Sequence, residues 1–315
     1  MGDVEDVTGE VFRAIDVDTA GAVEVLMVEA CLRDGAGGSP TAVVPDGAEL
    51  DDLEAAGIPA RTGASHVAVV HPQAGPGGGR PVRFFTAAGE LPGCGHGTVA
   101  AIAVLASQRP TSQRPGEGFR GLLRVAGREL PAVGGVRPDP GRGDLVEAWF
   151  DQGVVERRAA TDDERAAFLA ALGLERDAIH GDDEPVVASP GRERLLVPVV
   201  DRTVLAALRP DQERLAAASR RHGQLGCFVY VPPSATRPAA ARMFAPAVGV
   251  PEDVANANSS GCLAAHLLAT GRRPAVAVDQ GDALGRPSTV HATAVRTARG
   301  IVTRVGGTAR VLRRG

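Results

Sequence analysis

The sequence predicts an α+β protein with two pseudo-symmetric lobes, each a curved, mostly antiparallel β-sheet or barrel wrapped around a central helix. Short β-segments are cut by Gly and Pro at close intervals, which favours antiparallel sheet. Two further segments, Thr98 to Gln108 and Gly261 to Thr270, have the length of helices and are apolar on every side, so both should be buried. Each follows a loop of small and polar residues, so the two halves of the chain repeat one arrangement.

The expected strands run along most of the chain. In order they are Val67 to His71, Pro81 to Thr86, Leu145 to Phe150, Leu195 to Val200, Cys227 to Val231, Ala275 to Asp279, Ser288 to Arg296 and Ile301 to Val305. Three segments with a helical spacing of apolar residues predict outer helices at Ala48 to Ala56, Asp162 to Leu172 and Thr203 to Arg221.

The lobes are expected to meet in the Pro- and Gly-rich stretch from Val133 to Gly143. We place the boundary at Pro138, which gives an N-terminal lobe of residues 1–137 and a C-terminal lobe of residues 138–315. The final strand is the element expected to cross back to the N-terminal lobe.

Composition favours a small-molecule partner. The 315-residue chain has a net charge of −4, and its arginines alternate with acidic residues instead of forming a basic stripe, so we expect neither nucleic acid nor membrane as a partner. The chain contains no Lys, which excludes a lysine Schiff base and a phosphate-loop lysine. No stretch is long and apolar enough to span a bilayer, and we expect a cytoplasmic protein.

The cysteines are expected to be free thiols. Cys31, Cys94, Cys227 and Cys262 lack the paired spacing of metal or redox sites. The acidic run Asp182-Asp183-Glu184 is expected to be a solvated loop, because adjacent carboxylates on an irregular segment do not converge on a cation. No metal site is predicted.

The loop before the first buried helix carries a candidate active site. Gly95 and Gly97 let a ligand approach the backbone amides at the helix start, where the helix dipole favours an anion such as a carboxylate. Cys94 and His96 place a thiol and an imidazole beside that position. The alternative is a tight strand-to-helix turn in which both side chains only pack.

The loop before the second buried helix repeats the arrangement. Asp253 is a candidate proton carrier, and four polar side chains are candidate ligands for a bound acid: Asn256, Asn258, Ser259 and Ser260. Helix capping is the competing role for this group, and Ser259 or Ser260 is expected to be the N-cap. Two such helix starts facing each other would form a cleft.

These residues resemble the PhzF-like family, named for phenazine biosynthesis. The resemblance spans nearly the whole chain, through Gly38-Ser39-Pro40-Thr41-Ala42-Val43-Val44, Arg83-Phe84-Phe85-Thr86, Glu90-Leu91-Pro92, Cys94-Gly95-His96-Gly97-Thr98, Arg242-Met243-Phe244-Ala245-Pro246, Gly249-Val250-Pro251-Glu252-Asp253, Asp279-Gln280-Gly281, Gly285-Arg286-Pro287-Ser288 and Val305-Gly306-Gly307. It implies the diaminopimelate epimerase-like fold, a small acid bound between the lobes, isomerase activity, no cofactor or metal, and a homodimer.

The chain departs from this family at two places. Where the family has Ser-Glu-x-x-Phe, whose Glu is the general base, counting along the strand puts Gly63 at the position of the Glu. His66 lies three residues on, an odd offset that points it to the other face of a strand, so it ranks third as a replacement. Where the family has Pro-Ala-Thr-Gly-Ser after Asp253, this chain has a loop rich in Asn, which indicates a different substrate.

Three functions remain open from the sequence. The leading hypothesis is a proton-shift isomerase that uses Cys94, Asp253 and His96 on a small cyclic or amino-acid-like acid, in a pathway of secondary metabolism such as antibiotic biosynthesis. A pyrroline carboxylate in alkyl-proline formation is one possible substrate. The alternatives are an amino-acid racemase or epimerase that uses Cys94, for which Cys262 is more typical of a core thiol than of a second base, and a non-catalytic protein that binds a small acid.

Overall fold

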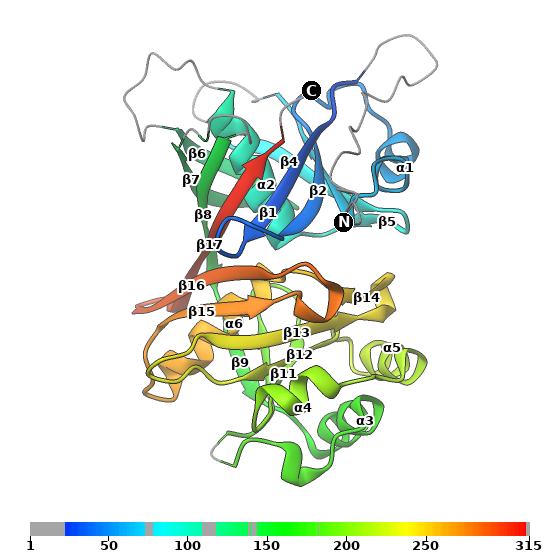
Figure 1. The fold of residues 1–315 in the computed structure, drawn as a ribbon, viewed down its shortest axis with the longest axis vertical. Coiled ribbons are helices and arrows are strands. Elements are labelled where there is room, and N and C mark those ends of the chain that lie inside the picture. Colours follow the sequence, from blue (N-terminus) through cyan, green and yellow to red (C-terminus); the bar gives the residue numbers. More distant parts are fainter. Residues whose placement is uncertain are drawn as a thin grey trace, which may run out of the picture.

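The computed structural model describes residues 23–72, 78–108, 118–137, 139, 144–181 and 183–312. Figure 1 shows two lobes stacked along the long axis of the molecule, which confirms the predicted fold class. No helix of the described residues is long and apolar enough to cross a membrane. The proposed boundary at Pro138 and the central part of the His71–Arg80 loop lie outside the described residues.

The two lobes repeat one order of elements. The first comprises β1 (Leu26–Leu32), β2 (Ser39–Val44), α1 (Asp52–Thr62), β3 (His66–Val70), β4 (Arg80–Thr86), β5 (Gly89–Leu91), α2 (Gly95–Ser107), β6 (Phe119–Val125), β7 (Arg128–Arg137) and β8 (Asp144–Val154). After β9 (Glu156–Ala159), α3 (Asp162–Leu172) and η1 (Arg176–Ala178) come β10 (Val186–Ser189), β11 (Arg194–Pro198), α4 (Arg202–Ala207), α5 (Gln212–Arg221), β12 (Cys227–Val231), β13 (Ala239–Ala245), η2 (Pro246–Val248), β14 (Val250–Asp253), α6 (Ala257–Ala269), β15 (Ala275–Gln280), η3 (Asp282–Leu284), β16 (Ser288–Thr297) and β17 (Gly300–Val311).

Strand pairing follows the same repeat. Most neighbours are antiparallel, and the parallel pairs occupy equivalent places: β2–β3 and β4–β6 in the first lobe, β11–β12 and β13–β15 in the second. The last strand of each repeat reaches across. β17 pairs with β16 in its own lobe and with β8 and β1 of the first, and β9, which continues β8, pairs with β10. Figure 1 shows β17 running from the lower lobe into the upper one.

The two central helices are the core of their lobes. Every residue of α2 from Gly95 to Ala106 is buried, as is nearly all of α6. Strands β1, β2, β7, β8 and β17 surround α2, and β15, β16 and β17 pack on α6. The uniform apolar composition that predicted burial therefore reflects helices enclosed by sheet on all sides.

Several element boundaries differ from the sequence prediction for local reasons. The helix expected over Thr203 to Arg221 is two helices, since Pro210 cannot continue one. α1 begins at Asp52 because Asp51 and Glu54 form a capping box. Both central helices begin earlier than expected, at Gly95 and Ala257, so the predicted loops are partly first helical turns.

A buried polar cluster holds the far end of α6. Asp183 accepts hydrogen bonds from Tyr230, Arg272 and His266 at 2.8 Å each. Burial alone would raise the pKa of Asp183, but these donors lower it to about 2. The expectation of a solvated acidic loop is wrong for Asp183, whose side chain is only 4% exposed because it links β12 to α6.

Asp183 predicts a loss of stability in acid. Its pKa in the folded state is below the unfolded value of about 3.9, so its contribution is complete above that value and is lost as the pH falls toward 2. Asp183→Asn should cost roughly 1–3 kcal/mol at pH 6 and flatten the dependence of stability on pH below 4. Urea unfolding at pH 6 and pH 3 measures this, with the exposed Asp177→Asn as control. Equal pH dependence in both variants would contradict the assignment.

Candidate active site

The N-termini of α2 and α6 touch. A Cβ atom placed on Gly95 would lie 2.7 Å from the Ala257 Cβ and 3.0 Å from the Asn258 backbone N, so only glycine fits there. The first amides of each helix have no acceptor within their own helices, and the positive ends of two helix dipoles meet at this point. The contact brings the two loops identified from the sequence into one site.

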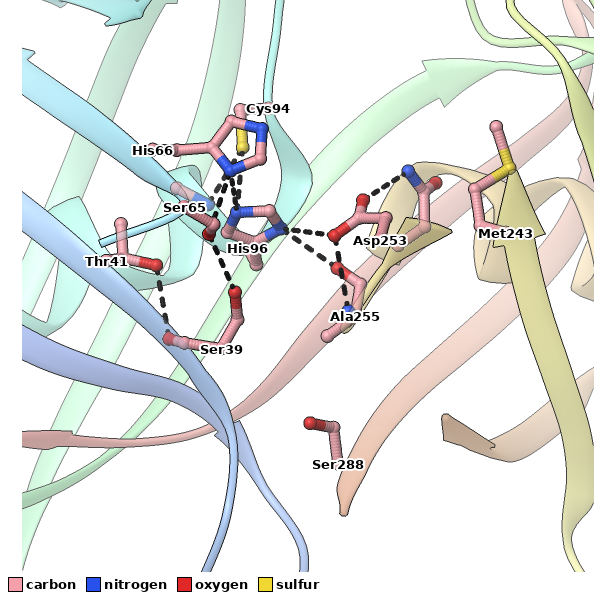
Figure 2. Close-up of polar contacts among 12 residues, drawn as sticks. Ser39, Thr41, Ser65, His66, Cys94, His96, Met243, Asp253, Ala255 and Ser288 are labelled. Carbon is pink, nitrogen blue, oxygen red and sulfur yellow. Dashed lines mark hydrogen bonds and ion pairs between the residues drawn. The ribbon is translucent and has the colours of Figure 1, made fainter. Parts of the chain in front are cut away.

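The loop before α2 is held by one side-chain cap and by a hydrogen bond to the other lobe. Cys94 is the N-cap of α2, and its Sγ accepts from the Gly97 N–H at 3.3 Å. His96 Nδ1 lies 3.0 Å from the Ala255 carbonyl oxygen and 3.5 Å from Asp253 Oδ1, both in the other lobe (Figure 2). Because a carbonyl only accepts, Nδ1 carries a proton and Nε2 faces the other way.

The second loop is capped by Asn256. Its Oδ1 accepts from the Ser259 N–H at 2.8 Å, and its Nδ2 donates to Asp253 Oδ2 at 2.9 Å. The expectation that Ser259 or Ser260 caps α6 is wrong, since α6 begins two residues before Ser259. Both serines are completely buried, and Ser260 donates to the Asn256 carbonyl at 3.0 Å.

His66 is the residue that the sequence ranked too low. It is buried, and its Nδ1 lies 3.0 Å from His96 Nε2 and 2.9 Å from Ser65 Oγ. Figure 2 shows the two imidazoles edge to face beside Cys94, whose Sγ lies 3.4 Å from His96 Nε2.

Gly63 lies outside this site. It is the exposed C-cap of α1, in the left-handed region at φ 68°, with open space where a side chain would begin. Counting by alternation from Gly63 was wrong because the alternation holds only within a strand, and β3 starts at His66. The structure therefore does not support the placement of Gly63 at the position of the general base.

The pKa values of the two imidazoles are shifted in opposite directions. Burial opposes a charge on His96, yet Cys94, Asp253 and the Ala255 carbonyl raise its pKa to about 10. Burial and the charge on His96 lower the pKa of His66 to about 3. Burial would raise the pKa of Asp253, but the two histidines and the hydrogen bond from Asn256 lower it. These opposite shifts favour a positive charge on His96 beside a neutral His66.

A pocket opens in front of this group, with a cavity volume of ≈ 140 Å³, close to the roughly 150 Å³ that holds one benzene molecule. Of the candidate residues, those that line it are His66, Cys94, Gly95, Asp253, Asn256 and Asn258. The others are not lining residues: His96, Gly97, Ser259 and Ser260. His96 therefore lies behind His66 and Cys94, away from the pocket surface.

Several lining residues gave no sequence signal. Arg194 opens the apolar strand β11, where a charged residue ordinarily flanks the core in contact with water, yet it is 2% exposed. Gln152 of β8 donates to the Asn258 carbonyl at 3.0 Å and accepts from Thr303 at 2.8 Å. Both positions depend on strands that come from distant parts of the chain.

One group of side chains has the spacing of a metal site. His66, Cys94 and His96 each offer a ligand atom, and these atoms lie within 4.8 Å of one another. In this arrangement His96 Nε2 and His66 Nδ1 share a hydrogen bond at 3.0 Å, so the two nitrogens are placed to exchange a proton. The other cysteines do not line the pocket: Cys31, Cys227 and Cys262 are fully buried, and burial raises the pKa of each.

The sequence matches a known protein family along most of its length. The family model for phenazine biosynthesis-like proteins matches residues 28–315. The chain belongs to this family. It is 34% identical over 246 residues to an uncharacterized isomerase of Deinococcus radiodurans, covering 74% of this chain and 75% of that protein. It is 30% identical over 224 residues to a trans-2,3-dihydro-3-hydroxyanthranilate isomerase of Pseudomonas fluorescens, covering 69% and 71%.

A solved structure shows the same fold. The predicted epimerase from Pseudomonas aeruginosa superposes with a TM-score of 0.73 at 27% identity, over 92% of this chain and 97% of that one. This is the diaminopimelate epimerase-like fold expected from the sequence. Both of these relatives are named isomerases, which supports isomerase as the class of activity.

Contact between the helix ends predicts a penalty for any side chain at Gly95. Gly95→Ala should lower stability by roughly 1–3 kcal/mol, because its Cβ overlaps Ala257 and forces the helices apart. Urea unfolding measures the change. Gly57→Ala in α1, where a Cβ would meet nothing closer than 3.7 Å, is the matched control and should be neutral or slightly stabilising. A Gly95→Ala variant as stable as the native chain would show that the helix ends do not touch.

Proposed function

We propose that this protein is a cofactor-independent isomerase that shifts a proton, and with it a double bond, within a small carboxylic acid. The observation that carries the proposal is the His66–His96 pair, hydrogen-bonded at 3.0 Å, with His66 facing a pocket at the junction of two helix N-termini. The helix ends supply an anion site for the substrate carboxylate. The pair supplies the proton.

His66 is the proposed proton carrier. We place Ser65-His66 at the position of the family's Ser-Glu, because His66 begins the strand that follows α1 and lines the pocket. On this placement an imidazole takes the role of the family's general base. Cys94, which also lines the pocket, is the second candidate, and Asp253 is a positioning residue that holds the charge on His96.

The pair can pass a proton in both directions. When His96 is charged, its Nε2–H donates to His66 Nδ1, and His66 Nε2–H is available to a substrate carbon. As that proton leaves, the His96 Nε2 proton moves to His66 Nδ1, and His66 Nε2 becomes a base for a second carbon. One proton is given and one is taken, so the enzyme returns to its starting state and the substrate is isomerised.

Solvent exchange tests the role of His66. Unsaturated cyclic amino acids, including pyrroline carboxylates, are incubated in D₂O and followed by NMR and by ultraviolet absorbance. His66→Gln should slow deuterium incorporation by about 10²–10⁴-fold, the usual contribution of a general acid–base residue. Cys94→Ser should have a smaller effect.

Gly63→Asn provides the matched control, because Asn tolerates the left-handed backbone at this position and adds a polar side chain outside the pocket. It should retain full exchange. If Cys94→Ser abolished exchange and His66→Gln did not, the thiol would be the proton carrier and our assignment would be wrong.

Racemisation is the second candidate function. It is favoured by Cys94 at a helix start, but Cys262, the cysteine that would serve as a second base, is fully buried within α6 and does not line the pocket. An isomerase changes the ultraviolet spectrum of its substrate, whereas a racemase inverts a stereocentre without doing so. A non-catalytic binding protein would show neither change.

The finer parts of the proposal come from the family resemblance, apart from the location, which is expected from the sequence itself. We include a role in secondary metabolism such as antibiotic biosynthesis, a pyrroline carboxylate in alkyl-proline formation as one substrate, a cytoplasmic location and a homodimer. Sedimentation velocity tests the last of these. We predict the mass of a dimer at micromolar concentration, and a monomer would contradict the prediction.

A further inference from the structure

One side chain in the pocket has no counter-ion. Arg194 is 2% exposed and lines the pocket, yet no carboxylate of the described residues is paired with it. Its neighbour Glu193 pairs instead with Arg158, at 2.7 Å. Burial lowers the pKa of Arg194, as expected for a cation removed from water, and the nearby Cys262 thiol opposes this only in part. An uncompensated buried charge is costly, so its presence calls for a partner outside the chain.

The hydrogen bonds of Arg194 hold it in place but leave donors unused. Nη1 donates to Ser259 Oγ at 3.3 Å, and Nη2 donates to the Arg192 carbonyl at 2.7 Å. The Nε–H is buried and has no acceptor among the described residues. A guanidinium has five N–H donors in a planar fork that suits a carboxylate. The two protein contacts hold the fork and engage one N–H on each terminal nitrogen, which leaves other donors of the guanidinium without a partner among the described residues.

The charges of the other residues that line the pocket also favour an anionic ligand. Arg192 and Arg128 also line the pocket, and Asp253 is the carboxylate among its described lining residues. Asp253 is already engaged by Asn256 and lies beside His96. One carboxylate of a ligand at the helix junction would leave the buried Arg194 without a counter-charge, whereas Arg128 is exposed and Arg192 is half-buried.

We propose that Arg194 forms a second anion subsite, so that the substrate is a small acid with two anionic groups, one at the helix junction and one on the guanidinium. The inference deepens the proposed function and rests on it for the identity of the first carboxylate. A cavity of ≈ 140 Å³ limits this ligand to a short acid, so a pyrroline carboxylate fits the proposal only if it carries a second acidic group. Arg194 is thereby the residue that selects for such acids.

Equilibrium binding tests the subsite without turnover. Isothermal titration compares glutarate with pentanoate, which has the same number of carbons and one carboxylate. The native chain should bind glutarate at least about tenfold more tightly, since hydrogen bonds to charged groups are worth that much or more. Arg194→Gln should lose this preference while its affinity for pentanoate is unchanged. Arg176→Gln removes the same charge from an exposed site and should keep the preference.

Two binding results would overturn the proposal. If Arg194→Gln weakened glutarate and pentanoate equally, Arg194 would serve the same carboxylate as the helix ends. If the native chain did not prefer glutarate, there would be no second subsite.

Thermal unfolding separates binding from a structural role. Arg194→Met should leave the Tm without ligand unchanged or raised, because it removes an unpaired buried charge, and should lose the rise in Tm that glutarate gives the native chain. A lowered Tm with an intact response to glutarate would make Arg194 a brace for α6 and refute the subsite.

The subsite and the isomerase activity can fail separately. Arg194-dependent binding of glutarate without proton exchange on any acid would refute the isomerase and leave the subsite. Proton exchange on monocarboxylic acids without any preference for glutarate would refute the subsite and leave the isomerase.

Discussion

Direct contact between the N-termini of α2 and α6 is the constraint on which the rest of the structure depends. Gly95 lies against Ala257 with no room for a side chain, and His96 bonds to the Ala255 carbonyl across the same junction. Two helix dipoles thus point their positive ends at one position, which is unfavourable unless negative charge is near. Asp253 supplies part of that charge, and a carboxylate ligand would supply the rest.

The exchanged strands explain how two lobes hold such a contact. β8 and β17 pair along ten positions, and each extends into the opposite lobe, where β9 pairs with β10 and β17 with β1. The lobes therefore share sheet hydrogen bonds beside both central helices. Gln152 of β8 uses this proximity to donate to the Asn258 carbonyl at the start of α6 while it accepts from Thr303 of β17. A continuous sheet makes the helix junction a fixed geometry suited to positioned acid–base groups.

The sequence predicted the parts of the site that depend on local structure. Cys94, Asp253, Asn256 and Asn258 were found because each lies within a few residues of the start of an all-apolar helix. Composition alone predicts such helices, because only complete enclosure suits a helix that is apolar on every side.

The sequence failed where the position of a residue depends on tertiary structure. His66 was misplaced because the end of α1 at Gly63 breaks the alternation of a strand. Arg194 gave no signal, since nothing in a single sequence shows that β11 runs beside the start of α6 and not along the surface. The cap of α6 was missed by three residues, because Asn and Ser are equally good N-caps and four such residues follow one another closely.

The central claim is that His66 and His96 hold one shared proton, with the charge on His96. Nitrogen-15 NMR of the imidazole side chains at neutral pH measures this directly, with the two signals assigned from the His66→Gln and His96→Asn variants. The account predicts that both nitrogens of His96 are protonated and that His66 is neutral, with a bare Nδ1, in keeping with a His96 pKa raised to about 10. A charged His66, or a neutral His96 with a bare Nε2 at neutral pH, would contradict it.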